Sequence, residues 1–214
     1  MASLKILLNK FKIGIIKLLY SIRARIEDWR LGRISVEKKI QSKYKDLGAN
    51  ASHSTDYRLL DRVFKTYPLK KDDMFIDVGC GEGRVLTYLY LRRVRNKLIG
   101  IELDADVAET ARKRTIKCNN IEVLCANILD CSELVKTATA FYIFNPFDET
   151  VLIPFIEMIE ENCKHKVTLY YLNDVPRKFL DKRDNWVIVR RDLVTRPGEL
   201  PFYFSVYRFL PNLD

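Results

Sequence analysis

The sequence has 214 residues, of which 48% are apolar, so it can bury one sizeable core but is short for two ordinary domains. A charged fraction of 30% argues for a folded globular protein rather than a disordered chain. The net charge of +9 suggests a nucleic-acid binder, but it is unevenly distributed. Residues 1–50 hold 12 Lys/Arg and 4 Asp/Glu, whereas residues 51–214 hold 25 and 24. The basic character therefore belongs to an N-terminal arm, and the rest is close to neutral.

The N-terminal arm, residues 1–50, begins with an amphipathic pattern. Apolar residues recur at helical spacing at Leu4, Leu7, Leu8, Phe11, Ile15, Leu18, Leu19, Ile22, Ile26 and Trp29. Four lysines within the first seventeen residues disfavour a membrane-spanning segment, and the absence of a small-residue cleavage site disfavours a secretory signal. The polar stretch 32–50 ends in Gly-Ala-Asn, which marks a break before a domain over residues 51–214.

Two partners remain open for the helix predicted over residues 4–29. It either packs on protein, as part of the domain or by self-association with a second copy, or it makes peripheral contact with a membrane, lying in the plane of the surface. A nucleic-acid arm is disfavoured because so many apolar residues do not serve phosphate contacts.

The cysteines and histidines indicate the compartment and the kind of site. The chain has an odd number of cysteines, without a CxxC spacing: Cys80, Cys118, Cys125, Cys131 and Cys163. Free thiols in a reducing compartment, and hence a cytoplasmic protein that is peripherally attached to a membrane at most, are expected. The two histidines, His53 and His165, are not at ligand spacing from cysteines or carboxylates, so no metal site is predicted.

From residue 56 onward, strands and helices alternate. Strands are predicted over 74–78, 98–102, 121–126, 140–144 and 167–172, and helices over 56–67, 85–94, 104–117, 131–136, 149–161 and 176–182. Continuous apolar strands separated by helices indicate a parallel α/β sheet that is covered on both faces. Two more strands, 186–191 and 202–209, are joined by a loop around Arg196-Pro197-Gly198, so they should form an antiparallel hairpin at one edge.

A glycine loop follows the first strand and opens a helix. Gly79, Cys80, Gly81 and Gly83 form a GxGxG pattern, in which the backbone turns sharply and a ligand can approach it closely. A dinucleotide site has GxGxxG instead, and the bulk of Arg84 at the sixth position would oppose close helix–strand packing. Asp77, two residues before the first glycine, suits an ammonium group and repels a pyrophosphate. S-adenosylmethionine carries an ammonium group and a sulfonium.

Further along, two polar residues follow strands. Glu102 ends the second strand, with Leu103 beside it, and its carboxylate can accept both ribose hydroxyls of an adenosine. Asn127, followed by Ile128, comes after the third strand and can reach the edge of the adenine. The two positions support an adenosine-containing ligand.

Over residues 55–210 the sequence resembles the class I S-adenosylmethionine-dependent methyltransferase family. FIDVGCGEGR, LIGIELD and EVLCANILD are similar to its first three motifs, although many members have aspartate where this chain has Asn127. The resemblance implies a Rossmann-like seven-stranded, mostly parallel sheet with an antiparallel last strand and helices on both faces, to which the amphipathic pattern of residues 4–29 adds an N-terminal helical extension. It implies that S-adenosylmethionine is bound by Tyr57, Asp77, Gly79, Cys80, Gly81, Gly83, Glu102, Leu103, Asn127, Ile128 and Asn145.

The segment AFYIFNPFD contains a motif that would bind the methyl acceptor, called the acceptor motif below. Its Asn145, Pro146 and Phe147 resemble the N-P-P-[FY] element of methyltransferases that act on amino nitrogens, with Phe147 in place of the second proline. The resemblance implies that the Asn145 side chain and the next main-chain carbonyl hold an N–H₂ group, and that the aromatic ring stacks on a planar substrate. The competing interpretation is a helix start with Asn145 as its cap.

The predicted activity is methyl transfer from S-adenosylmethionine to a small or saccharide-like acceptor with an oxygen or nitrogen nucleophile. The alternatives are N-methylation of a protein or nucleobase through Asn145, Pro146 and Phe147, and a non-catalytic module that binds the cofactor. An NAD-dependent oxidoreductase is disfavoured by Arg84. His53, Asp148 and Tyr57 are the candidate bases, although Tyr57 is better placed to cover the methionine moiety and Asp148 to sit at a helix N-terminus.

Overall fold

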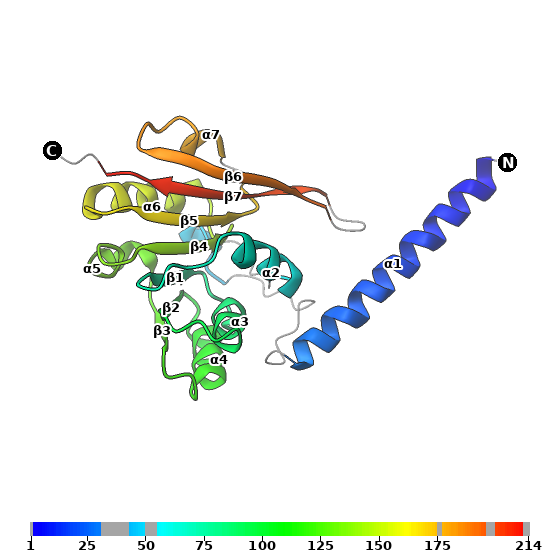
Figure 1. The fold of residues 1–214 in the computed structure, drawn as a ribbon, viewed down its shortest axis with the longest axis horizontal. Coiled ribbons are helices and arrows are strands. Elements are labelled where there is room, and N and C mark those ends of the chain that lie inside the picture. The colour runs from blue at the N-terminus through cyan, green and yellow to red at the C-terminus, as the bar shows by residue number, and fades with distance from the viewer. Residues whose placement is uncertain (1, 31–42, 50–54, 175–176, 196–199, 212–214) are drawn as a thin grey trace.

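The computed structural model describes residues 2–30, 43–49, 55–174, 177–195 and 200–211. These residues contain one seven-stranded sheet (Figure 1). Its strands are β1 Met74–Val78, β2 Lys97–Glu102, β3 Ile121–Cys125, β4 Ala140–Phe144, β5 Val167–Leu172, β6 Trp186–Val194 and β7 Phe202–Phe209. In the sheet they lie in the order β3-β2-β1-β4-β5-β7-β6. The first five are mutually parallel, and β7 runs antiparallel to both β5 and β6.

Helices cover both faces of the sheet, because neighbouring strand residues point to opposite sides. On one face, Phe75 and Tyr142 pack against residues of the helices α2 Tyr57–Thr66, α3 Arg84–Leu91 and α4 Ala105–Thr115. On the other face, Ile76 and Phe141 pack against α6 Glu149–Asn162, with the shorter helices α5 Ser132–Val135 and α7 Arg177–Leu180. A 3₁₀ turn, η2 Ile128–Asp130, follows β3.

Three aspartates begin helices in the way their sequence positions suggest. The side chains of Asp56, Asp104 and Asp148 accept hydrogen bonds from backbone N–H groups in the first turns of α2, α4 and α6. The predictions for Asp104 as a cap and for Asp148 as a helix N-terminal charge are confirmed. The competing prediction, Asn145 as the cap of α6, is wrong, because Asp148 holds that place.

The predicted sheet is confirmed, including the antiparallel hairpin and the reversed last strand. Helix α3 begins one residue earlier than predicted and ends at Leu91, and α5 is shorter than the predicted range 131–136. Residue 176 of the predicted last helix and the hairpin loop at 196–198 lie outside the described residues.

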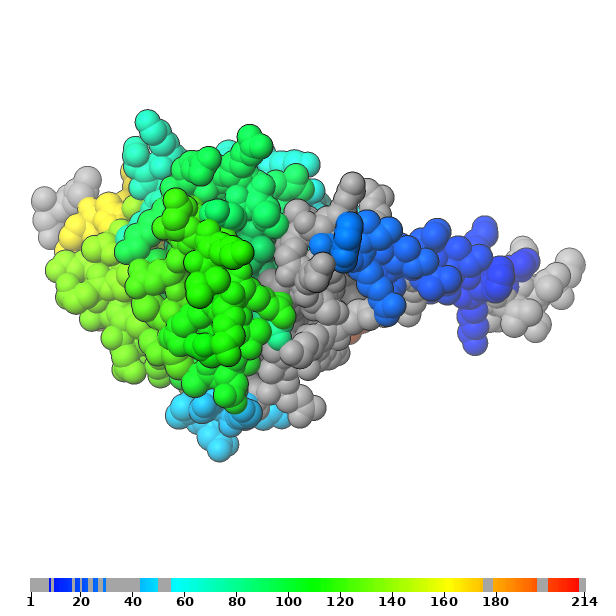
Figure 2. All heavy atoms as spheres, turned by 90° about the horizontal axis from the view of Figure 1, so that it is seen from below, coloured from blue at the N-terminus to red at the C-terminus, as the bar shows by residue number. Residues whose placement is uncertain are grey.

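Residues 2–30 of the N-terminal arm form one continuous helix, α1 Ala2–Arg30. It projects from the body of the molecule in Figures 1 and 2. Among the described residues, no helix has both the length and the apolar content that crossing a membrane requires.

The end of the arm contacts the core. The 3₁₀ turn η1 Lys45–Leu47 leads to Gly48, whose carbonyl accepts a hydrogen bond from the Asp148 amide at 2.9 Å. Ala49 then forms an isolated antiparallel bridge with Phe147. Residues 43–49, which the sequence assigns to the arm, are therefore attached next to the start of α6. The predicted domain boundary at residue 50 itself lies outside the described residues.

Candidate functional site

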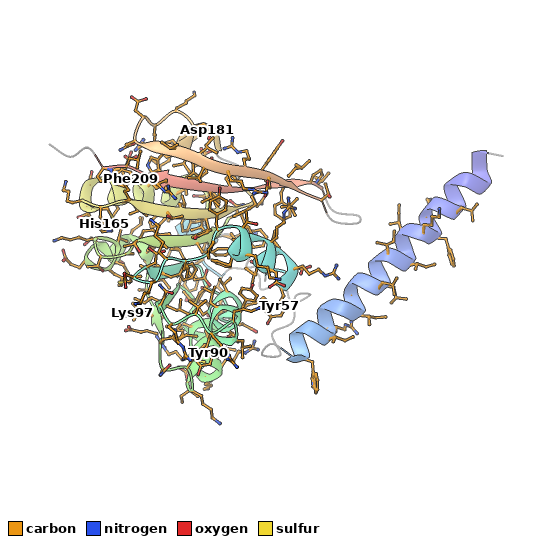
Figure 3. All side chains as sticks on the ribbon, in the orientation of Figure 1. Tyr57, Tyr90, Lys97, His165, Asp181 and Phe209 are labelled. Carbon is orange, nitrogen blue, oxygen red and sulfur yellow. The ribbon has the colours of Figure 1, made fainter. Side chains whose placement is uncertain are left out.

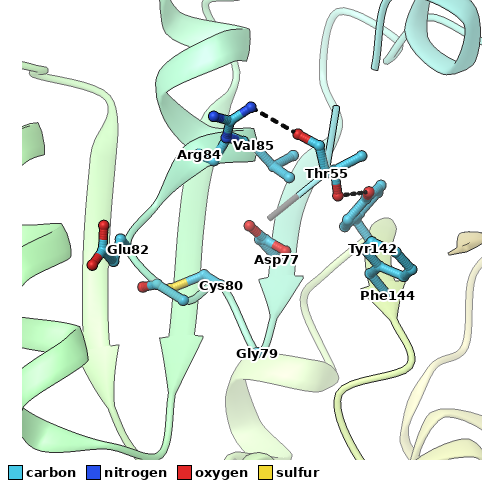
Figure 4. A pocket seen from close by; sticks show the side chains of 10 residues that line it. Thr55, Asp77, Gly79, Cys80, Glu82, Arg84, Val85, Tyr142 and Phe144 are labelled. Atoms are coloured by element: carbon cyan, nitrogen blue, oxygen red, sulfur yellow. Dashed lines mark hydrogen bonds between the residues drawn. The ribbon is translucent and has the colours of Figure 1, made fainter. Parts of the chain in front are cut away.

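A pocket lies at the carboxyl ends of β1 and β4, where ligands bind in open parallel sheets. Its empty space, including the part open to solvent, is about 350 Å³. The lining comes from the loop after β1, the start of α3, the end of β4 and the residue before the Asp56 cap: Thr55, Asp77, Gly79, Cys80, Gly81, Glu82, Arg84, Val85, Tyr142 and Phe144 (Figure 4).

The glycine loop has the sharp turns that its sequence predicts. Gly79, Gly81 and Gly83 have φ angles of 71°, 55° and 80°, which place all three in the left-handed region that favours glycine. The amides of Gly79 and Cys80 both donate to the carbonyl of Ile101 on β2, at 2.9 and 3.0 Å. The loop is thus held on the neighbouring strand with its backbone facing the pocket.

Asp77 provides the one carboxylate at the end of β1, and it is buried. The residue is 2% exposed, and its Oδ2 has no hydrogen-bond partner among the described residues. Burial raises the pKa of this carboxyl well above its usual value, and the nearby charge of Glu102 raises it further. An orphaned buried carboxylate oxygen beside a pocket fits a cationic group of a ligand, which would restore the missing interaction.

Glu102 lies at the end of β2 and supports the glycine loop. Its Oε2 accepts from the Gly81 amide at 2.9 Å, and its Oε1 accepts from the Asp104 amide at 3.0 Å. Burial raises the pKa of Glu102, and these two backbone N–H groups lower it in part. The carboxylate is fixed next to Gly81, and each of its oxygens has a further lone pair for a ribose hydroxyl. Glu102 and the half-buried Leu103 beside it are not among the pocket-lining residues.

Asn127 acts as a cap in the structure. Its Oδ1 accepts a hydrogen bond from the Leu129 amide at 3.1 Å and so begins η2. Because Oδ1 of Asn127 accepts the hydrogen bond of the turn, the side-chain N–H₂ group is the part that can bind a ligand. This group would donate a hydrogen bond to a ring nitrogen of adenine. Ile128 is buried beneath the turn, and neither residue is among those that line the pocket.

A chain of side chains above Asp77 was missed by the sequence reasoning. The Arg84 guanidinium donates to the carbonyl of Thr55 at 3.1 Å and stacks over the Tyr57 ring at 4.2 Å. The hydroxyls of Thr55 and Tyr142 are hydrogen-bonded at 2.7 Å (Figure 4). Arg84 therefore holds the chain before α2 at the rim of the pocket.

The sheet register brings these residues together. Tyr142 pairs with Asp77 on the neighbouring strand, so both side chains are on the same face. The alternation of strand residues is visible in the sequence, but that β1 and β4 are neighbours is not, and this explains why Tyr142 was not predicted. Tyr57 is 2% exposed and packs behind Arg84, so it does not line the pocket as the predicted cover of a methionine moiety would.

Two further predicted residues of the loop have different surroundings. Cys80 lines the pocket, and burial raises its pKa well above the usual value, so it is a neutral thiol that packs against Gly100. Gly83 is the N-cap of α3, and a Cβ there would lie 3.5 Å from the Cβ of Ala111 on α4. Gly83 is thus a packing position rather than a lining one.

The acceptor motif divides into a half-buried part and a buried part. Asn145 is half-buried with φ 45°, and Pro146 lies against Gly79. Phe147, however, is 8% exposed and packs edge-to-face on Phe155, with ring centroids 6.0 Å apart. The implied stacking of Phe147 on a substrate therefore needs correction, because its ring is a core side chain.

Phe144 is the aromatic residue that lines the pocket in place of Phe147. It is half-buried and stacked with Phe202 of β7, at 6.1 Å between centroids and 25° between planes. The ring comes from the strand end itself, one residue before the motif, which is why the motif did not point to it.

The candidate bases are not gathered at the pocket. Asp148 is exposed and caps α6, and Tyr57 lies under Arg84. His53 lies outside the described residues. His165 is hydrogen-bonded to the carbonyl of Ala138 and lies at the opposite end of the sheet from Tyr57 (Figure 3). Within the described residues, no group of three or more His, Cys, Asp or Glu side chains can hold a metal ion.

Comparison with known proteins shows which proteins this chain is similar to. Residues 75–164 match a family described as a methyltransferase domain. Three solved structures share the fold with a TM-score of 0.55. An RNA methyltransferase from Salinibacter ruber, in complex with S-adenosyl-L-homocysteine, is 20% identical and is matched over 75% of this chain and 95% of its own. None of the curated protein sequences matches the chain.

The other two similar structures are named as different methyltransferases. A precorrin-6y C5,15-methyltransferase from Geobacter metallireducens is 12% identical, over 73% of this chain and 90% of its own. A putative methyltransferase from Streptococcus mutans, in complex with S-adenosylhomocysteine, is 14% identical, over 73% and 99%. The core of this protein therefore has the class I, Rossmann-like methyltransferase fold. Within it, the matched segment runs from the start of β1 to just before β5 and so contains the glycine loop, Glu102, Asn127 and Asn145.

Proposed function

We propose that this protein is an S-adenosylmethionine-dependent methyltransferase. The observation that carries the proposal is the buried Oδ2 of Asp77, which lies beside the pocket with no hydrogen-bond partner among the described residues. The ammonium group of the methionine moiety would give this oxygen its partner. That two of the similar structures hold S-adenosylhomocysteine supports the same assignment.

The other residues fit the remaining parts of the cofactor. Glu102 would accept the ribose hydroxyls, because its carboxylate is fixed at the end of β2. The Asn127 amide would donate to the adenine. Gly79 and Gly81 would let the ligand lie close to the backbone, where a Cβ would stand in its way. A pyrophosphate has no such fit, since it would meet the Asp77 carboxylate.

When bound, S-adenosylmethionine supplies a methyl group on a sulfonium that is already a good leaving group. The task left to the chain is alignment of the acceptor, which can contribute several orders of magnitude to the rate. Asn145 and Pro146 would serve this alignment, and the contact of Pro146 with the glycine loop at Gly79 supports that role. Asn145 would orient the nucleophile through its amide side chain, and the half-buried Phe144 would exclude water beside it.

For the acceptor, we favour a small molecule with an oxygen or nitrogen nucleophile and a flat or apolar part. The stacked rings of Phe144 and Phe202 would receive that part. N-methylation of a protein or nucleobase remains the second candidate, and the half-buried Asn145 favours it, whereas the buried Phe147 does not.

Calorimetric titration tests the cofactor. Wild-type protein should bind S-adenosylmethionine and S-adenosylhomocysteine but not NAD, and Glu102→Ala should weaken the binding by tenfold or more. Glu122→Ala is the matched control, because Glu122 is an exposed acid on the neighbouring strand β3 and should bind as the wild type does. Absence of binding to the wild type would refute the proposal.

Transfer of a labelled methyl group to a fractionated cell extract tests the acceptor. Label in the small-molecule fraction would support the favoured class, and label in protein or RNA would select the second candidate. Tight cofactor binding with no label in any fraction would favour a non-catalytic module.

A further inference from the structure

Helix α1 exposes a large apolar surface. Its ten described Leu, Ile, Phe and Trp side chains are between 43% and 69% exposed, with Trp29 and Phe11 at the upper end. Figure 2 shows the helix standing out from the body of the protein. Monomeric soluble proteins seldom leave so large a contiguous apolar surface uncovered, so this one marks a docking surface.

The apolar residues are ordered around the helix. At about 100° per residue, eight of these ten residues fall within an arc of roughly 120°, which by sequence also includes Leu4 and Leu7, with only Arg25 at its border. This apolar arc consists of Leu4, Leu7, Leu8, Phe11, Ile15, Leu18, Leu19, Ile22, Ile26 and Trp29. Ile13 and Ile16 lie on the opposite side, next to Asn9 and Glu27.

Basic residues border the apolar arc on both sides. By helical spacing, Lys5, Lys12, Arg23 and Arg30 fall about 20–40° outside one edge of the arc, and on the other side Arg25 falls at the edge and Lys10 about 60° outside it. Long basic side chains beside an apolar surface can reach the headgroups of a membrane while the apolar face lies below them. The charge pattern is thus complementary to an anionic surface.

The same pattern disfavours pairing of α1 with a second copy. In a parallel pair, the two edges of one helix face the opposite edges of its partner, and in an antiparallel pair like edges face each other. Both edges are basic, so either arrangement would place Lys and Arg opposite Lys and Arg, which is destabilising. Asp28 is the only acidic residue near either edge.

We infer that α1 binds an anionic lipid bilayer, lying in the plane of its surface with the apolar arc in the acyl boundary. The helix is tied to the acceptor side of the pocket, since residues 43–49 are attached there through Gly48–Asp148 and Ala49–Phe147. The segment from Arg30 to Lys43 reaches at most about 45 Å. Docking of α1 therefore keeps the pocket close to the membrane surface, whichever acceptor it serves.

Flotation of the full-length protein with vesicles tests this inference. The protein should bind vesicles of phosphatidylcholine and phosphatidylserine, and it should bind pure phosphatidylcholine at least tenfold more weakly. Ile22→Asp and Ile13→Asp form a matched pair, because the two isoleucines are 47% and 45% exposed on opposite sides of the helix. Ile22→Asp should reduce binding tenfold or more, and Ile13→Asp should change it by less than threefold.

Tryptophan fluorescence gives an independent measurement. Trp29 is 69% exposed and Trp186 is 5% exposed, so only Trp29 should shift to the blue when anionic vesicles are added. Trp29→Phe should remove the shift. Lys10→Glu with Lys12→Glu should lower binding by about 25-fold or more, since each basic residue near an anionic surface contributes about fivefold.

Three results would overturn the inference. The first is an absence of binding to anionic vesicles, and the second is an equal loss in Ile22→Asp and Ile13→Asp. The third is a blue-shifted Trp29 in buffer without lipid, together with a dimer in sedimentation that Ile22→Asp converts to a monomer. That result would assign the apolar arc to a second copy of the chain.

Discussion

Gly79, which lines the pocket, is in close contact with Pro146: a Cβ on Gly79 would lie 2.5 Å from the Cβ of Pro146. The glycine belongs to the loop after β1, and the proline belongs to the motif after β4. Because these strands are neighbours in the sheet, the loop that would hold the cofactor and the motif that would hold the acceptor are in direct contact. The contact between Gly79 and Pro146 therefore sets the position of the proposed acceptor motif relative to the proposed cofactor loop.

The first prediction concerns this contact. Gly79→Ala should lower the free energy of unfolding by about 2 kcal/mol or more, because a side chain at φ 71° is strained and meets Pro146. It should also abolish S-adenosylmethionine binding. Denaturant unfolding and calorimetry measure the two effects. Gly14→Ala, in open space on α1, is the control and should not destabilise the protein. An unchanged stability of Gly79→Ala would contradict the geometry.

The second prediction concerns the cost of burying Asp77. Burial places the pKa of Asp77 in the folded protein well above its unfolded value of about 3.8. At pH values between 3.8 and the raised pKa, the folded state therefore binds more protons than the unfolded state. Stability without ligand should therefore fall as the pH rises through this window. Asp77→Asn should have a higher Tm than the wild type at neutral pH, and the difference should vanish near pH 4. Asp72→Asn, an exposed change nearby, should show no such difference, and a Tm of Asp77→Asn below the wild type at neutral pH would refute the prediction.

The third prediction is a pH dependence of cofactor affinity. An ammonium group needs the ionised form of Asp77, so binding must remove a proton below the raised pKa of that carboxyl. Affinity for S-adenosylhomocysteine should rise by up to tenfold per pH unit in that range. Methylthioadenosine lacks the ammonium group but keeps the ribose that Glu102 would hold, so it serves as the control and its affinity should depend less steeply on pH. Equal pH profiles for the two ligands would show that Asp77 does not hold the ammonium.

The fourth prediction separates the two aromatic residues of the acceptor side. Phe147→Ala should destabilise the protein by about 3–5 kcal/mol, because the ring is buried against Phe155. Phe144→Ala should destabilise it less but reduce methyl transfer to the extract fraction that the wild type labels. Urea unfolding and labelled transfer measure these effects. A Phe147→Ala variant that is as stable as the wild type but has lost methyl transfer would contradict this prediction. It would indicate that Phe147, not Phe144, stacks on the acceptor.

The sequence determined the class of fold, because strand and helix periodicities are local. Apolar runs such as Val167–Leu172 and caps such as Asp104 depend on neighbours only a few residues away, and the hairpin at the end follows from the lack of room for a helix. The glycine pattern and Asp77 likewise lie within one short segment, so a pocket suited to a cationic ligand could be predicted from it.

Only the tertiary structure decided which side chains meet. Tyr142 comes next to Asp77, and Phe144 rather than Phe147 faces the pocket, because the order of the strands and the burial of each ring are set by contacts between distant segments. For the same reason Arg84, expected to hinder packing, turned out to join Thr55 and Tyr57 at the rim of the pocket. Spacing along a chain fixes which residues can share an element, whereas the packing of elements fixes which of them share a site.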